Sequence, residues 1–216
     1  MSLLKRDNIE LTEVSDYKIY PIADNKAPKL SADRLEYTFI NGTYLKKVWD
    51  LSTIKEMYED IEIMQNEENV PELGFKTVKM AEKFVDGASQ LWPIWISSGD
   101  TITMYFFADI LEKMYKQNFI TKDDLYKLSE REIIDLIENC SNKEISNSFR
   151  NFMNCNSFVD CEEYRPDKFC VDRKVKRRYI NPITNKGRVY DISSFAKEKI
   201  DGYINMPVSR FAYMDI

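Results

Sequence analysis

Five consecutive residues, Asp33-Arg34-Leu35-Glu36-Tyr37, bring together side chains that could do chemistry. In a helix, positions four apart share a face, so the carboxylate of Asp33 and the phenol of Tyr37 would point the same way, with Glu36 beside Asp33. An aspartate in the first turn of a helix is also favoured simply by the helix dipole. The spacing alone therefore favours a structural role.

The chain contains no histidine, which limits the chemistry that it can perform alone. Imidazole is the most common general base near neutral pH and the most common metal ligand. A Ser-His-Asp triad, a Cys-His pair and a histidine-rich zinc site are therefore excluded within this polypeptide. What remains is carboxylate, lysine, tyrosine or cysteine chemistry, or a protein without catalysis.

The composition indicates an ordinary globular protein, with 44% hydrophobic residues and a formal net charge of −5. The acidic charge argues against non-specific nucleic-acid binding, and no apolar run approaches the roughly 20 residues of a membrane helix. The cysteines lack the Cys-x-x-Cys spacing of zinc sites. We therefore expect reduced, mostly buried thiols in a cytoplasmic protein. The four cysteines are Cys140, Cys155, Cys161 and Cys170.

Capping residues and apolar spacing predict the elements that position these side chains. Ser31 is expected to cap a helix that ends near residue 40, where Asn-Gly follows, and Thr77 to cap a second one. Asp100 is expected to begin a strongly apolar helix at the centre of the core. The segments 61–64 and 72–75 flank a polar stretch and predict a short β-hairpin.

This pattern predicts a mainly α fold, organised as a helical body over residues 1–156 and a small α+β subdomain over residues 157–216. In the subdomain, two strands over 170–180 and 187–192 are expected to form a β-hairpin. A helix from Ser194 to about Asn205 follows them.

The segment Leu30–Thr38, which contains the Asp33-Arg34-Leu35-Glu36-Tyr37 run, resembles the late segment of the HD-domain phosphohydrolase superfamily. The similarity is to its deoxynucleotide triphosphohydrolase-like branch, and it covers most of the chain as the C-terminal half or more of such a protein. In that family an Asp-Arg-Leu-Asp/Glu-Tyr helix supplies the last aspartate of an H…HD…D metal site. The resemblance implies that Asp33 is a metal ligand and that Arg34 and Tyr37 lie near the phosphate or sugar of the substrate.

The first histidine and the His-Asp pair of that family have no counterpart in this chain. The opening residues Ser2–Asn8 are typical of the last turn of a helix, so we expect the chain to begin inside an element, as a fragment would. One aspartate cannot hold a divalent ion, which needs several fixed donors. The resemblance thus implies a metal-dependent hydrolase of a phosphorylated small molecule or nucleotide. Its divalent metal ion belongs to the complete site only, and this chain is inactive alone.

The alternative is a non-catalytic module that binds a ligand or another protein on the same helical scaffold. The missing histidines and the acidic surface favour it. In either case, a helical body that lacks some of its packing partners exposes apolar surface, so self-association is expected.

The segment Arg173–Tyr179 contains the only concentrated basic run. It could bind the phosphates of a nucleotide, with Tyr179 stacked on the base. We favour an edge strand whose lysines discourage pairing with other strands, because strand alternation would divide these charges between two faces.

Overall fold

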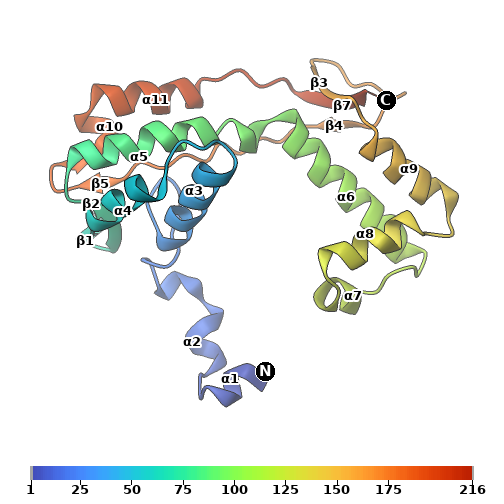
Figure 1. The fold of residues 1–216 in the computed structure, drawn as a ribbon, viewed down its shortest axis with the longest axis horizontal. Coiled ribbons are helices and arrows are strands. Elements are labelled where there is room, and N and C mark those ends of the chain that lie inside the picture. Colours follow the sequence, from blue (N-terminus) through green and yellow to red (C-terminus); the bar gives the residue numbers. More distant parts are fainter. Residues whose placement is uncertain (1, 216) are drawn as a thin grey trace. The chain divides into compact units, whose positions relative to one another are not determined.

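The computed structural model describes residues 2–215. Figure 1 labels its helices and strands. In chain order the elements are α1 (Ser2–Arg6), α2 (Leu11–Ser15), η1 (Tyr17–Ile19), α3 (Ala32–Tyr44), α4 (Leu51–Glu59), β1 (Ile61–Gln65), β2 (Pro71–Phe75), α5 (Val78–Leu91), η2 (Ile94–Ile96), α6 (Ser98–Lys116), α7 (Lys122–Lys127), α8 (Glu130–Glu138), α9 (Lys143–Met153), β3 (Ser157–Cys161), β4 (Cys170–Asp172), β5 (Ile183–Thr184), β6 (Gly187–Arg188), α10 (Val189–Ile192), α11 (Ser194–Ile204) and β7 (Phe211–Asp215).

The chain forms two compact units, and each is built from two separate stretches. Unit 1 contains the residues through Pro93 together with Arg177–Met206. Unit 2 contains Ile94–Lys176 together with the residues from Pro207 onwards. Each unit therefore closes only when a late segment of the chain returns to an early one.

Unit 1 has a four-stranded sheet in the order β1-β2-β5-β6. The strands β1 and β2 form an antiparallel hairpin in which Ile61 lies opposite Phe75. β5 joins β2 in parallel and pairs with β6 in antiparallel. The helix α5 contacts β2, α3 and α11, so it lies at the centre of this unit (Figure 1).

The core of unit 1 is largely aromatic. The ring of Trp49 stacks on Phe84 with centroids 6.0 Å apart and meets the edge of Phe39 at 5.6 Å. This ring fits between α3 and α5 because a glycine faces it from each helix. A Cβ atom on Gly42 would come within 2.5 Å of the Trp49 ring, and one on Gly87 within 2.0 Å.

Unit 2 has a three-stranded antiparallel sheet in the order β3-β7-β4. The helix α6 contacts all three strands and α9, and its apolar side joins them in one buried cluster. Phe106 of α6 stacks on Phe152 of α9 with ring centroids 4.3 Å apart. Buried apolar side chains of the sheet, such as Ala212 and Met214 of β7, complete the cluster.

The expectation of a mainly α fold is wrong. The chain is about 52% helical and 13% strand, and its two sheets make it a mixed α/β protein. Every strand named above has two to five residues, and β2, β5 and the three strands of unit 2 pair with segments far along the chain. Such strands are too short to display a clear alternation of apolar and polar residues, which is the signal that identifies strands in a sequence.

The division into units crosses the boundary expected at residue 156. Of the last 60 positions, β3, β4 and β7 belong to unit 2, whereas β5, β6, α10 and α11 belong to unit 1. The strand expected over 170–180 is also wrong beyond Asp172, because 173–182 has no regular secondary structure. The strand expected over 187–192 ends at Arg188, and α10 follows.

Several local predictions are confirmed. Ser31 Oγ caps α3 by accepting a hydrogen bond from the Arg34 amide, and Thr77 caps α5. The predicted hairpin is β1 and β2. The central apolar helix is α6, but its cap is Ser97, and Asp100 occupies the first turn.

Candidate functional site

The start of α3 is held firmly in unit 1. Ser31 is fully buried, and its hydroxyl accepts a hydrogen bond of 3.3 Å from the Arg34 amide. Leu30 and Leu35, on either side of the cap, are also buried. The helix continues to Tyr44 rather than ending near residue 40. The Asn-Gly pair is not a helix stop here, because Gly42 provides the space for the Trp49 ring.

Arg34 holds the loop that precedes α3. Its Nη1 donates to Asn25 Oδ1 at 2.6 Å, to the Lys29 carbonyl at 2.9 Å and to Ser31 Oγ at 3.1 Å. Its Nη2 donates to the Asn25 carbonyl and to Asp24 Oδ1. Burial lowers the pKa of this guanidinium, an effect that the nearby Asp24 opposes. The guanidinium thus binds its own loop, and a contact between Arg34 and substrate stays a prediction.

Asp33 lies one position earlier and differs from Arg34 in its surroundings. Its side chain is exposed in the first turn of α3, and its amide donates to the Ala23 carbonyl at 3.1 Å. Among residues 2–215, its carboxylate forms no ion pair and accepts no hydrogen bond. The backbone of Asp33 is therefore fixed while its carboxylate is available.

Tyr37 lies on the same side of α3 as Asp33, one turn further on, and 62% of its surface is exposed. Ile40 and Tyr44 continue this line and are 46% and 77% exposed. Leu35 and Phe39, which are buried, lie on the opposite side of the helix. We call the exposed side the outer face of α3 and define it by Asp33, Glu36, Tyr37, Ile40 and Tyr44.

Asp33 has no group of metal-binding side chains around it among residues 2–215. Within the described part of the chain, no three side chains of histidine, cysteine, aspartate or glutamate are grouped where an ion could bind. Asp24, in the loop before α3, has a carboxylate oxygen 3.4 Å from Arg34 Nη2. Asp33 can therefore contribute one donor to an ion, and the remaining donors must come from elsewhere.

A buried carboxylate that the sequence did not indicate supports the same loop. Glu72 of β2 is fully buried, and its carboxylate accepts hydrogen bonds from Arg188 at 2.6 and 2.8 Å. It also accepts from the Leu30 amide at 3.1 Å and from Asn66 Nδ2 at 3.1 Å. Glu72 thus ties the sheet to the residue that precedes the cap of α3. No local signal could have identified this pair, since Arg188 follows Glu72 by 116 positions.

Arg188 also binds Glu67, which is at the turn of the β1-β2 hairpin. Its Nε and Nη2 donate to the two oxygens of Glu67 at 2.7 and 2.8 Å. These hydrogen bonds lower the pKa of Glu67 to about 2. Burial alone would lower the pKa of Arg188, but its hydrogen bonds to Glu72 and Glu67 outweigh burial and raise it.

Two arginines of the basic run, Arg173 and Arg177, bind other parts of the chain through their guanidinium groups. Arg173 is buried in unit 2, where it donates to the Asp160 carboxylate and to the Ile96 carbonyl. In unit 1, Arg177 donates to the carbonyls of Tyr203 and Met206. Since these residues are not in a strand, the expected edge strand does not explain them. Their guanidinium groups donate to main-chain carbonyls at the end of η2 and at or just after the end of α11.

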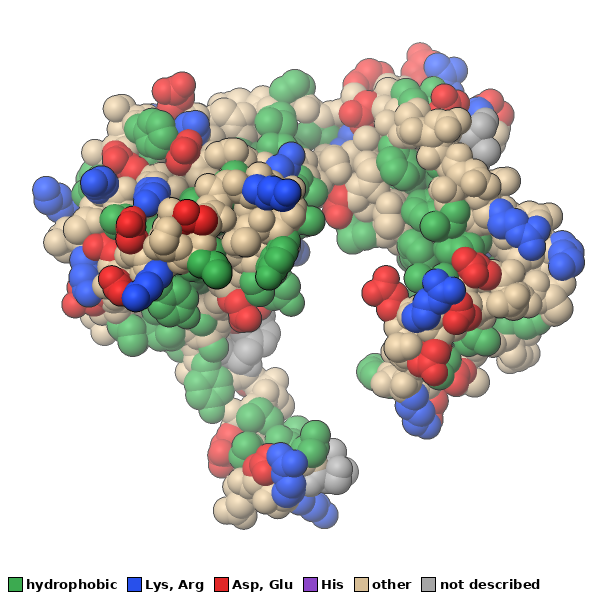
Figure 2. All heavy atoms as spheres, viewed as in Figure 1, with side chains coloured by type: hydrophobic (Ala, Val, Ile, Leu, Met, Phe, Trp, Pro, Cys, Tyr) green, Lys and Arg blue, Asp and Glu red, His purple; other side chains and the backbone are tan. Residues whose placement is uncertain are grey.

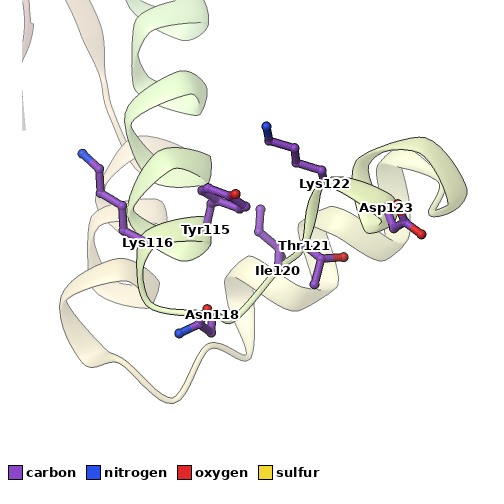
Figure 3. A pocket seen from close by; sticks show the side chains of 7 residues that line it. All are labelled: Tyr115, Lys116, Asn118, Ile120, Thr121, Lys122 and Asp123. Atoms are coloured by element: carbon purple, nitrogen blue, oxygen red, sulfur yellow. The ribbon is translucent and has the colours of Figure 1, made fainter.

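An open hollow of about 660 Å³ lies in unit 2 between the end of α6 and the start of α7. Figure 3 shows that Lys116 and Asn118 point away from Thr121 and Asp123, so the polar groups do not converge. The hydroxyl of Thr121 is already used in the capping box of α7. The hollow is lined by Tyr115, Lys116, Asn118, Ile120, Thr121, Lys122 and Asp123.

None of the four cysteines is in a disulfide. Cys140 is buried, whereas the other three cysteines are partly exposed. The expectation of mostly buried thiols is therefore wrong. Burial and the neighbouring Cys170 raise the pKa of the Cys161 thiol. A raised pKa reduces the thiolate fraction near neutral pH, which argues against Cys161 as a nucleophile.

No family model, curated protein or solved structure matches this chain. Among the described residues, no helix combines the length and the apolar character that crossing a membrane requires.

Proposed function

We propose that this chain contributes one part of a metal-dependent phosphohydrolase of the HD superfamily, which acts on a phosphoester such as a nucleotide. In this proposal Asp33 is one ligand of a divalent ion. The nitrogen donors come from polypeptide outside these 216 residues, because the chain has no histidine. The chain alone is then inactive.

The observation that carries this proposal is the available carboxylate of Asp33 on a fixed backbone. Polar side chains near a helix start usually cap the helix or pair with a neighbour, as Ser31 and Asp24 do here. Asp33 does neither within residues 2–215. A carboxylate that has a defined position and no partner suits a ligand that another group completes.

The contacts that hold the backbone around Asp33 favour a role as a metal ligand over that of an ordinary charged residue at the surface. Arg34 holds the loop before the helix, and Glu72 holds the Leu30 amide. The carboxylate therefore projects from backbone that has little freedom to move. A metal ligand gains affinity from such a fixed position, because less conformational entropy is lost when the ion binds.

Tyr37 supports a phosphoester or nucleotide as the substrate. Its exposed phenol lies one turn from Asp33 on the outer face of α3. A tyrosine in this position can donate to a phosphate or sugar oxygen, or stack on a base. The role of Arg34 in this proposal is weaker, since its Nη atoms already bind the loop.

The alternative function is a docking module without a metal. The specific observation in its favour is the exposed apolar line formed by Tyr37, Ile40 and Tyr44. Apolar side chains that are contiguous at the surface are typical of protein interfaces. This line requires a partner whether or not the partner brings metal donors.

Metal content and hydrolysis, measured together, test the proposal. The assembly that contains this chain is isolated from its native cells through an affinity tag. Its manganese, iron and zinc are then measured, as is its hydrolysis of deoxynucleoside triphosphates and of bis(p-nitrophenyl) phosphate. We expect bound metal in the wild type and a loss of roughly tenfold or more in metal and activity in Asp33→Asn.

The matched control is Asp123→Asn. Asp123 is an exposed aspartate in the first turn of α7, and its variant is expected to keep wild-type metal and activity. If the Asp33→Asn assembly retains its metal, Asp33 is not a ligand and the proposal fails. If the wild-type assembly contains a stable partner and no divalent metal, the docking module is the correct function.

A further inference from the structure

The two edge strands of the unit 2 sheet carry one cysteine each. β3 ends at Cys161, which lies opposite Phe211 of β7, and β4 begins at Cys170, which lies opposite Tyr213. Residues two apart on a strand share a face, and directly paired residues lie on the same face of a sheet. The alternate residues of β7 are buried in the core cluster with α6. Both cysteines therefore lie on the face of the sheet that points away from that core.

The connection 162–169 between these strands crosses β7 on the same face. β3 and β4 are both antiparallel to β7 and lie on opposite sides of it. Within the connection, the ring of Tyr164 meets the edge of the Phe211 ring, with centroids 5.9 Å apart. The Arg165 amide then donates to Cys170 Sγ at 3.4 Å. The connection therefore folds back onto the start of β4.

The two thiols lie close enough to interact. Burial raises the pKa of the Cys161 thiol, and the neighbouring Cys170 thiol raises it further through its charge and a hydrogen bond. Both cysteines are partly exposed, and residues 162–167 between them are exposed. Figure 2 shows charged side chains at the surface where Figure 1 draws β3 and β4. A small oxidant in solution can therefore reach the pair.

We infer that Cys161 and Cys170 form a reversible disulfide with a low-molecular-weight disulfide, such as glutathione disulfide, as the oxidant, and that this bond fastens the connection over β7. The bond closes a short ring of chain beside the strand that joins β3 to β4. Such a ring restricts the unfolded chain, so the oxidised form of unit 2 is the more stable one. This inference does not depend on the proposed function, because it concerns unit 2 and does not involve Asp33.

The oxidation takes place in two exchange steps. The Cys170 thiolate attacks glutathione disulfide, whose S–S bond breaks, and one glutathione leaves as a thiolate and takes up a proton. Cys161 then loses its proton and attacks the Cys170 sulfur, which releases the second glutathione. Cys170 reacts first because the raised pKa of Cys161 reduces its thiolate fraction. In total, two thiols are oxidised to one disulfide, and glutathione disulfide is reduced to two molecules of glutathione.

Equilibration of the purified chain with mixtures of reduced and oxidised glutathione is the test. Free thiols are alkylated, and peptide mapping by mass spectrometry identifies the Cys161–Cys170 bond. We expect its equilibrium constant to be roughly tenfold or more higher in the folded chain than in the chain unfolded in urea, because the fold holds the thiols together. Equal constants in the two states would overturn the inference. So would a folded chain that forms no such bond, or one in which either cysteine pairs with Cys155 instead.

Serine variants distinguish this pair from ordinary exposed thiols. In Cys161→Ser and in Cys170→Ser, the remaining cysteine should stop at the mixed disulfide with glutathione. The control Cys155→Ser removes another partly exposed thiol of unit 2 and should form the bond as the wild type does. Circular dichroism verifies that each variant is folded. A control that loses the bond would contradict the assignment of the pair.

Hydrogen exchange with mass spectrometry measures the effect of the bond on the sheet. Oxidation should slow amide exchange over residues 162–169 and in β7 by roughly tenfold or more, and reduction with dithiothreitol should reverse the change. Exchange in α5 of unit 1 is the internal control and should not change. A disulfide that forms but leaves exchange in both segments of unit 2 unaltered would show that it does not fasten the connection.

Discussion

Arg188 donates two hydrogen bonds to the fully buried carboxylate of Glu72, although 116 positions separate the two residues. The same carboxylate accepts a hydrogen bond from the Leu30 amide. This one acidic group therefore joins strands β2 and β6 of the sheet of unit 1 to the loop before α3. The position of Asp33 depends on this connection.

Replacing Arg188 by methionine should destabilise the protein by about 3–5 kcal/mol, because Glu72 would then be buried without its charge partner. The double variant Arg188→Met with Glu72→Gln should be more stable than the single variant, since it has no uncompensated charge. Urea unfolding followed by circular dichroism measures both. A single variant that loses less than about 1 kcal/mol would show that the pair is not important for stability.

Acidification should weaken unit 1 through Glu67. Its hydrogen bonds from Arg188 lower its pKa in the folded protein from 4.5 to about 2. A carboxylate with a lowered folded pKa adds stability that is present above pH 4.5 and lost as the pH falls toward 2. We expect Glu67→Gln to reduce the slope of unfolding free energy against pH in this window. The exposed Glu138, replaced by glutamine, is the control and should leave the slope unchanged.

Arg34→Lys should loosen the loop before α3 while the helix itself remains. Lysine keeps the charge but cannot reach Asn25, Lys29 and Ser31 at once, as the guanidinium does. We expect a loss of about 1–3 kcal/mol and faster amide exchange over residues 21–30. Hydrogen exchange with mass spectrometry measures this directly. Unchanged exchange in this loop would contradict the role of Arg34.

Two glycine-to-alanine changes should have opposite effects. A Cβ atom on Gly87 would overlap the Trp49 ring, so Gly87→Ala should destabilise unit 1 by about 1–3 kcal/mol. Gly202 in α11 has no atom within 4 Å of an added Cβ, so Gly202→Ala should stabilise the protein by up to about 1 kcal/mol. Thermal unfolding and tryptophan fluorescence distinguish the two. Equal effects would mean that Trp49 can move aside.

Predictions from the sequence succeeded where the signal is contained within one or two turns. Ser31 and Thr77 cap their helices because each hydroxyl reaches an amide three residues later. The prediction that Asp100 begins α6 is wrong by one turn, since Ser97 provides the cap of this helix. Both residues suit a cap, and only the packing of the helix selects between them.

The sheets could not be predicted in the same way. β5 has two residues and joins β2, which is more than 100 positions earlier in the chain. The three strands of unit 2 form one sheet only after β7 returns between β3 and β4. Their pairing depends on contacts between distant segments, which leave no periodic pattern in any one of them.

The candidate site was likewise predictable only in its local features. Its residue types and the helix that carries them follow from the sequence alone, because capping and helical spacing are local. Only the tertiary structure decided that Arg34 turns inward to bind its loop while Asp33 and Tyr37 stay exposed. The physical reason is that the core selects which side of α3 is buried, and that side is set by Trp49, Phe84 and the sheet beneath them.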